Sequence, residues 1–165
     1  MTYLSTYLNA RVSGPLLLVL LTLCLPAVAR AQGNKRLGGG DEPIFVEYRG
    51  VQIGWLADDV RKKLGDPANK GDEQDYYMFG EKEMAQFQYD KATKKVIAIS
   101  VDFINGASAV LTPQQVFGSD IEAKPDGSKY KLIRYPKAGY WLSYNRTAGD
   151  TPIITVTIQK LTGPQ

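Results

Sequence analysis

Short runs in which apolar and polar residues alternate recur along the chain from about residue 76 onward. In one of them Ala85, Phe87 and Tyr89 alternate with Gln86 and Gln88, which is the period of a strand with one buried face. We predict strands over residues 76–79, 85–89, 96–103, 130–135, 140–145 and 153–161, and a short strand or extended lead-in over residues 44–54.

The same alternation predicts which side chains face the core. The strand over residues 96–103 carries the strongest pattern, and it is expected to point Ile97, Ile99, Val101 and Phe103 to one side. The last strand is expected to do the same with residues 154, 156 and 158.

Two segments have helical signals instead. Residues 58–64 place Val60 and Leu64 four apart on one face, with acids in the first turn and bases in the last, which suits the helix dipole. Residues 111–116 open a second helix, with Thr112 as N-cap, Pro113 at the first helical position and Gln115 completing a capping box.

The order of these elements repeats. Residues 56–60 match residues 111–116, residues 87–89 match 142–144, and residues 96–101 match 153–158. We predict an α+β fold with two units, about residues 44–105 and 106–161, each a short helix followed by a three-stranded meander. Together they form one antiparallel sheet with the short helices on one face. Chance similarity between two such segments remains the alternative.

The first 31 residues have the features of a secretory signal peptide. They contain Arg11 and Arg30 but no acid, an apolar run over residues 15–25, and small-residue cleavage patterns that end at Ala29 or Ala31. An uncleaved anchor and lipid attachment at Cys24 are the alternatives, although Leu23 is not the small residue that a lipid-attachment site needs before its cysteine. Residues 32–43 are expected to form a Gly-rich flexible linker, residues 44–161 a single domain, and residues 162–165 a tail.

Composition excludes most catalytic chemistry. The chain has no histidine and one cysteine, so it can hold no Ser-His-Asp or Cys-His site and no internal disulfide, and a structural zinc site is not expected. There are 20 basic and 17 acidic residues. Because Arg11 and Arg30 would leave with the signal, the mature domain is nearly neutral and carries no electrostatic argument for nucleic-acid binding.

The remaining acids do not form a convincing site. Asp58 and Asp59 are neighbours on a helix and point in different directions, whereas a glycosidase needs two carboxyl groups that flank one bond. The acidic run at residues 72–75 is expected to be a solvated loop, because it fails the spacing of a calcium-binding loop. We therefore expect no catalytic residue, no metal site and no cofactor.

Residues 51–67, Val-Gln-Ile-Gly-Trp-Leu-Ala-Asp-Asp-Val-Arg-Lys-Lys-Leu-Gly-Asp-Pro, resemble the opening of the SmpA/OmlA (BamE-like) domain family. Tyr76-Tyr77 and Lys95-Val96 extend the resemblance to about residues 50–103. It implies an exported helix-plus-antiparallel-sheet domain that supports the assembly of outer-membrane proteins. Leu56 stands where the family has a Ser or Thr cap. The apparent duplication also resembles the architecture of secreted beta-lactamase inhibitor proteins, which implies a module that occludes an enzyme.

The candidate binding residues lie on the face of the sheet that the alternation leaves uncovered. Trp141 and Ser143 share this parity with Gln86 and Gln88. An exposed tryptophan among polar residues is a candidate anchor for a protein partner, although a flanking loop that covers it is the alternative. We expect a non-enzymatic module that binds an envelope assembly component at the periplasmic side of the outer membrane. A secreted protein that binds an enzyme is the alternative.

Overall fold

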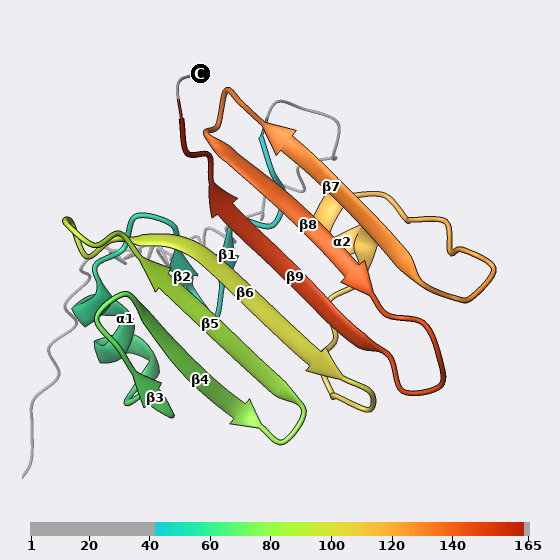
Figure 1. Ribbon diagram of the computed structural model, residues 1–165, viewed down its shortest axis with the longest axis horizontal. Coiled ribbons are helices and arrows are strands. Elements are labelled where there is room, and N and C mark those ends of the chain that lie inside the picture. The colour runs from blue at the N-terminus through green and yellow to red at the C-terminus, as the bar shows by residue number, and fades with distance from the viewer. Residues whose placement is uncertain (1–41, 164–165) are drawn as a thin grey trace, which may run out of the picture. The chain divides into compact units, whose positions relative to one another are not determined.

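The computed structural model describes residues 42–163, which form a seven-stranded antiparallel sheet, a two-stranded hairpin and two short helices (Figure 1). The elements are, in chain order, β1 (Glu47–Tyr48), β2 (Val51–Gln52), α1 (Ala57–Leu64), β3 (Asn69–Lys70), β4 (Gln74–Gly80), β5 (Glu83–Tyr89), β6 (Val96–Ile104), α2 (Pro113–Phe117), β7 (Lys129–Tyr135), β8 (Tyr140–Arg146) and β9 (Ile153–Lys160). The broad prediction of an α+β fold with an antiparallel sheet is confirmed.

The strands of the large sheet are ordered β3-β4-β5-β6-β9-β8-β7. Each of the two meanders therefore contributes its last strand to the centre, where β6 and β9 pair over seven residues from Ala98 opposite Gln159 to Ile104 opposite Ile153. The sheet is continuous because this one pairing joins the two halves.

One face of the sheet, which we call the core face, carries the buried core. Phe87, Ile99, Val101, Leu142 and Val156 come from four different strands, and each is 0 % exposed. Both helices lie behind this face in the view of Figure 1. Burying each such side chain contributes roughly 1.5–3 kcal/mol, so the core face is the main source of stability for the sheet.

The first helix forms as predicted and begins one residue earlier, at Ala57. Val60 is 0 % exposed and anchors it to the core. Leu56 occupies the N-cap position but makes no side-chain cap, and the Ala57 N–H instead donates to the Lys94 carbonyl at 3.0 Å. A carbonyl from the loop before β6 therefore satisfies the first N–H of the helix, one of the four donors at a helix N-terminus that have no partner within the helix.

The second helix has the predicted cap in full. The Thr112 side chain accepts from the Gln115 backbone, the Gln115 side chain accepts from the Thr112 N–H at 2.9 Å, and Pro113 opens the helix. Gly118 ends it in the left-handed region at φ 73°, a conformation that costs glycine little.

The structure corrects the predicted core face of β6. Tyr89 pairs with Val96 while Gln88 pairs with Ala98, so Ile97 is an extra residue at a bulge. Val96 consequently points to the core with 1 % exposure, and Ile97 is only partly buried. Alternation assumes an unbroken period of two, and one inserted residue shifts the face of everything before it.

Two further features differ from the prediction. The lead-in folds as the separate β1–β2 hairpin, whose turn residues Arg49 and Gly50 both have positive φ, as a two-residue type I′ turn requires. The two-residue strand β3 was not predicted, and it pairs with β4 at Tyr76 and Asp75.

Several predictions concern residues that the structure does not describe. The signal peptide, Cys24 and most of the linker lie outside residues 42–163; Pro43, at the predicted end of the linker, is buried. Within the described part of the chain, neither helix is long and apolar enough to cross a membrane.

Val60→Asp is expected to lower the free energy of unfolding by at least about 3 kcal/mol, because it leaves an unpaired carboxylate in the core. Lys62→Asp, on the exposed side of α1, is the matched control and should cost less than about 1 kcal/mol through the helix dipole. Urea denaturation followed by circular dichroism measures both. Equal midpoints for the two variants would show that the assigned face of α1 is wrong.

Candidate functional site

The predicted binding residues all lie on the face opposite the core, which we call the open face. Strand register places them in two rows across the sheet. The first row runs Gln88, Ala98, Gln159, Trp141, and the second runs Gln86, Ser100, Thr157, Ser143. Each row spans three strand spacings, or about 14 Å, so the four residues form two separated pairs rather than one cluster.

The four predicted residues differ in solvent exposure and in the hydrogen bonds that they already make. Gln88 is exposed, whereas Gln86, Trp141 and Ser143 are partly buried. Gln86 donates a hydrogen bond to Gln74 on β4, so its amide is already engaged. Within residues 42–163 the indole N–H of Trp141 has no hydrogen-bond partner and is not buried. Trp141 therefore offers an apolar ring and a donor together.

Most of the apolar surface on this face lies at residues that were not predicted to bind. Six large apolar side chains among the described residues stand out as exposed, and four of them (Met78, Tyr130, Leu132 and Ile153) are on the open face. Met78 is 56 % exposed and Tyr130 57 %. Alternation within each strand could have identified this apolar surface, because residues two apart share a face of the sheet. Met78 lies two residues from Tyr76, and Tyr130 lies two residues from Leu132.

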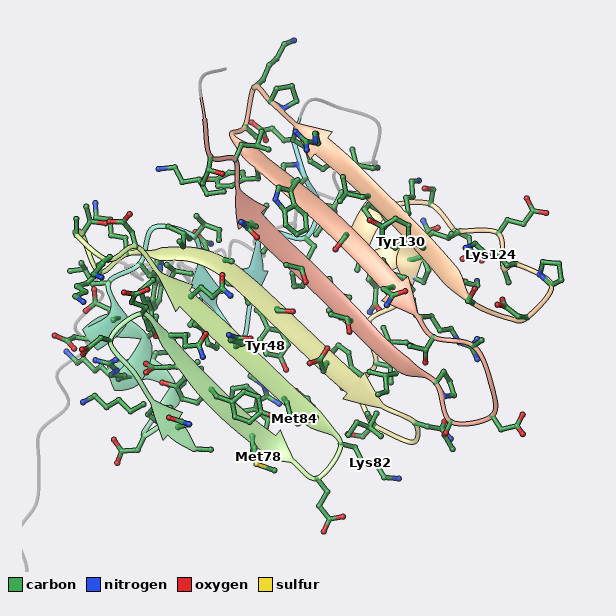
Figure 2. The ribbon with its side chains drawn as sticks, in the orientation of Figure 1. Tyr48, Met78, Lys82, Met84, Lys124 and Tyr130 are labelled. Atoms are coloured by element: carbon green, nitrogen blue, oxygen red, sulfur yellow. The ribbon has the colours of Figure 1, made fainter. Side chains whose placement is uncertain are left out.

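Except for Ile153, which lies opposite Ile104 in the central strand pair, these side chains gather at the two sides of the open face. The β4–β5 apolar cluster consists of Tyr76, Met78 and Met84, with Met78 directly opposite Met84 and the Tyr76 hydroxyl donating to the Met84 sulfur. The β7–β8 apolar cluster consists of Tyr130, Leu132 and Trp141. Figure 2 shows Met78 and Met84 together on one side and Tyr130 on the other.

A polar strip separates the two clusters along β6 and β9. Ser100 and Thr157 share a hydrogen bond of 3.0 Å, and the Thr155 hydroxyl donates to Asp102 at 2.6 Å. Because these groups satisfy one another across the central pair of strands, the strip is held in one arrangement before any partner arrives.

The most tightly organised charges lie on the core face instead. Asp75 is 0 % exposed, and the Arg61 guanidinium donates two hydrogen bonds to its carboxylate, at 2.8 and 3.0 Å. The Tyr89 hydroxyl donates to the same carboxylate at 2.8 Å, and the Gly71 N–H donates at 3.2 Å. The expectation that residues 72–75 form a solvated loop is therefore wrong for Asp75, which lies in β4 on the parity of Tyr77.

The electrostatics of this network indicate a structural role. The hydrogen bond to Asp75 raises the pKa of Arg61. Burial, together with the hydrogen bond to Asp75 and its charge, raises the pKa of Tyr89 far above the usual range. Arg61 and Tyr89 therefore both keep their protons near neutral pH, and their hydrogen bonds to Asp75 join α1 to β4 and β5.

A cleft of about 630 Å³ lies beside this network, between Asp58 of α1 and Lys94. Arg61 lines it, but the guanidinium is bound to Asp75, and Lys94 donates to the Asp72 carbonyl at 3.1 Å. Among the described residues there is no group of three or more Asp, Glu, His or Cys side chains that could hold a metal ion.

A second polar cluster fixes the β1–β2 hairpin to β5. Glu83 accepts hydrogen bonds from the Tyr48 hydroxyl and from Arg49, the latter at 2.6 Å, and the Arg49 guanidinium lies 4.0 Å from the centre of the Phe79 ring. Burial alone would raise the pKa of Glu83, but hydrogen bonds from Tyr48 and Arg49 and the charge of Arg49 hold it below its ordinary value of 4.5.

No protein-family model, no curated protein and no solved structure matches this chain. The resemblance of residues 51–67 to the SmpA/OmlA (BamE-like) family therefore stays a prediction from sequence.

Glu83→Gln should reduce the acid sensitivity of the fold. Because the pKa of Glu83 is lower in the folded state, its contribution to stability is present above pH 4.5 and is lost as the pH falls through the folded-state value. Urea midpoints measured from pH 7 downward should therefore fall less steeply for the variant than for the wild type. Glu81→Gln, in the exposed turn beside it, should follow the wild type.

Arg61→Ala should cost about 3–5 kcal/mol in unfolding free energy, because it leaves the Asp75 carboxylate buried without its cation. Lys62→Ala removes a neighbouring exposed base and should change stability by less than about 0.5 kcal/mol. A small loss for Arg61→Ala would mean that water or another group reaches Asp75 and replaces the guanidinium.

Proposed function

We propose that this chain is an exported, non-enzymatic protein-binding module and that its partner docks on the open face of the sheet. The observation that carries the proposal is the concentration of exposed apolar side chains there, at Met78, Tyr130, Leu132 and Ile153. Exposed apolar surface rimmed by polar groups is typical of protein interaction sites. A tryptophan with an unused donor, such as Trp141, is the kind of residue that anchors such interfaces.

The arrangement favours a broad partner surface over a small molecule. The two apolar clusters lie on opposite sides of a satisfied polar strip, and Gln88 and Trp141 alone are separated by about 14 Å. Small-molecule sites are concave and mostly apolar, whereas this face alternates apolar, polar and apolar zones.

An envelope or outer-membrane assembly component is the proposed partner, with the protein at the periplasmic side of the outer membrane. The signal-like residues 1–31 and the resemblance of residues 51–67 support this assignment. The second candidate is a secreted inhibitor that occludes an enzyme, and the arrangement of the two meanders favours it.

We also propose that the sheet contains two related units, about residues 44–105 and 106–161. Matching residues 96–101 with residues 153–158 makes Ser100 the counterpart of Thr157, and these two residues lie directly opposite each other in the central strand pair. A local two-fold axis through this pair would exchange β4-β5-β6 with β7-β8-β9. Val60 and Val116, each four residues after its N-cap and each 0 % exposed, support the same relation.

The strand pairing favours a different match between β5 and β8 from the one the sequence indicates. A two-fold axis at Ser100 and Thr157 makes Gln86 the counterpart of Ser143 and Phe87 that of Tyr144. The sequence match of residues 87–89 with 142–144 is shifted by two residues, which keeps the same face of the strand and therefore leaves the apolar pattern unchanged.

Trp141→Ala is expected to leave the fold intact and to weaken partner binding by tenfold or more, because truncating an aromatic anchor typically costs about 2 kcal/mol or more. The experiment begins with a photo-crosslinking amino acid at position 141 in native cells and identifies the captured proteins by mass spectrometry. Binding of the purified partner to wild type and Trp141→Ala then tests the anchor, with Lys62→Ala on α1 as the control.

The identity of the captured protein separates the two candidates. Envelope assembly components support the first and a secreted hydrolase supports the second. Capture at position 62 equal to that at position 141, or unchanged binding by a folded Trp141→Ala protein, would contradict docking on the open face.

A further inference from the structure

The strand β7 ends the large sheet and is a regular edge. It pairs with β8 over all seven residues, from Lys129 opposite Arg146 to Tyr135 opposite Tyr140, with no bulge. Among the described residues no strand lies on its other side. At the opposite end of the sheet, by contrast, β3 covers part of the edge of β4.

The usual features that prevent edge pairing are weak here. Natural edge strands are interrupted by proline or a bulge, or carry charges that repel an incoming strand. The sequence of β7 contains no proline. Its two lysines are engaged on the core-face side of their own chain, and its third base, Arg134, is exposed on the open face. Lys129 is paired with Asp120 at 3.2 Å, while Lys131 donates to Ser119 and lies 5.1 Å from the centre of the Phe117 ring.

The segment between α2 and β7 contacts the strand through these side chains. Its backbone hydrogen bonds join Lys124 to Ser128 and Gly127 to Lys124, and none within the described part of the chain reaches residues 129–134. The outer backbone groups of β7 are therefore available to another strand.

We propose that β7 pairs antiparallel with β7 of a second copy of this chain, centred on Leu132. The side chains that one register of two such strands places opposite each other argue for this occupant. In this register Tyr130 lies opposite Arg134, Lys131 opposite Ile133 and Lys129 opposite Tyr135, while Leu132 lies opposite its own counterpart. No like charges face each other, and an arginine beside a tyrosine ring is attractive.

Other registers fit less well. Shifting by one residue would place core-face side chains opposite open-face ones, which a continuous sheet does not allow. Centring on Lys131 places two ammonium groups opposite each other, and centring on Ile133 leaves part of the strand unpaired. Only the register centred on Leu132 uses all seven residues of β7.

The pairing is isologous, since both copies contribute the same strand. It would continue the open face across two molecules and bring both β7–β8 apolar clusters together at the junction. The assembly adds to the proposed function but does not depend on it. The pairing involves the backbone edge of β7, whereas the proposed partner protein docks on the open face.

Sedimentation equilibrium of the purified protein, from micromolar to millimolar concentration, tests the pairing. The wild type is expected to form dimers and no larger species. Leu132→Lys should raise the dissociation constant by about tenfold or more, since like charges directly opposite each other destabilise a strand pair. Met78→Lys is the matched control, because Met78 is an exposed apolar residue on the open face of β4, and this variant should dimerise as the wild type does.

A cysteine crosslink tests the register independently. In full-length protein carrying Cys24→Ser, Leu132→Cys should form a disulfide-linked dimer on mild oxidation, because opposed residues of an antiparallel pair have Cα atoms about 4.5–5.5 Å apart. Met78→Cys, also exposed, should link much less. Circular dichroism confirms that each variant is folded.

A wild-type protein that stays monomeric at every concentration overturns the proposal. So does a dimer that Leu132→Lys leaves unchanged, or equal crosslinking at positions 132 and 78. Dimer formation that is lost in Leu132→Lys alone, with selective crosslinking at position 132, supports it.

Discussion

The pairing of β6 with β9 is the interaction on which the rest of the structure depends. It joins two consecutive meanders of the chain into one sheet, and it carries Ile99, Val101 and Val156 into the centre of the core. It also sets the register of the open face, because the strip that separates the two apolar clusters belongs to these two strands. Without this pairing, each meander would be a three-stranded sheet with half a core.

The core face and the open face divide the chemistry between them. Charged groups on the core face have partners there, as Asp75 has Arg61 and Glu83 has Arg49, and these pairs fix α1 and the β1–β2 hairpin to the sheet. The open face carries few charges and many apolar and hydroxyl groups. Rigidity on one side therefore supports a preformed surface on the other, and a surface that is already ordered loses little conformational entropy when a partner binds.

Much of the fold could be predicted from sequence, because strands with one buried face leave an alternating pattern. The pattern located six strands of the sheet, and the capping box at Thr112 located α2. It failed at Ile97, where a bulge breaks the period, and at Asp75, where a charged residue occupies a core position because Arg61 neutralises it. Pairing partners such as these are distant in sequence and leave no local signal.

The candidate site was predictable in part for the same reason. Parity alone was enough to predict that Trp141, Ser143, Gln86 and Gln88 share a face. Their separation into one pair on β5 and one pair on β8, and the gathering of Met78, Met84 and Tyr76, follow from the strand order and register of the sheet. The sequence of a single strand does not contain this information.

The backbone contact at the start of α1 has a consequence for the stability of the helix. The helix has eight residues, too few to be stable alone in water, and its N-terminal donor is satisfied by Lys94, which lies 37 positions away and itself has a positive φ of 55°. The helix therefore gains its cap only when the β5–β6 hairpin is in place. The stability of α1 is therefore linked to that of a segment that comes later in the chain, and the helix and the sheet support each other in the folded state.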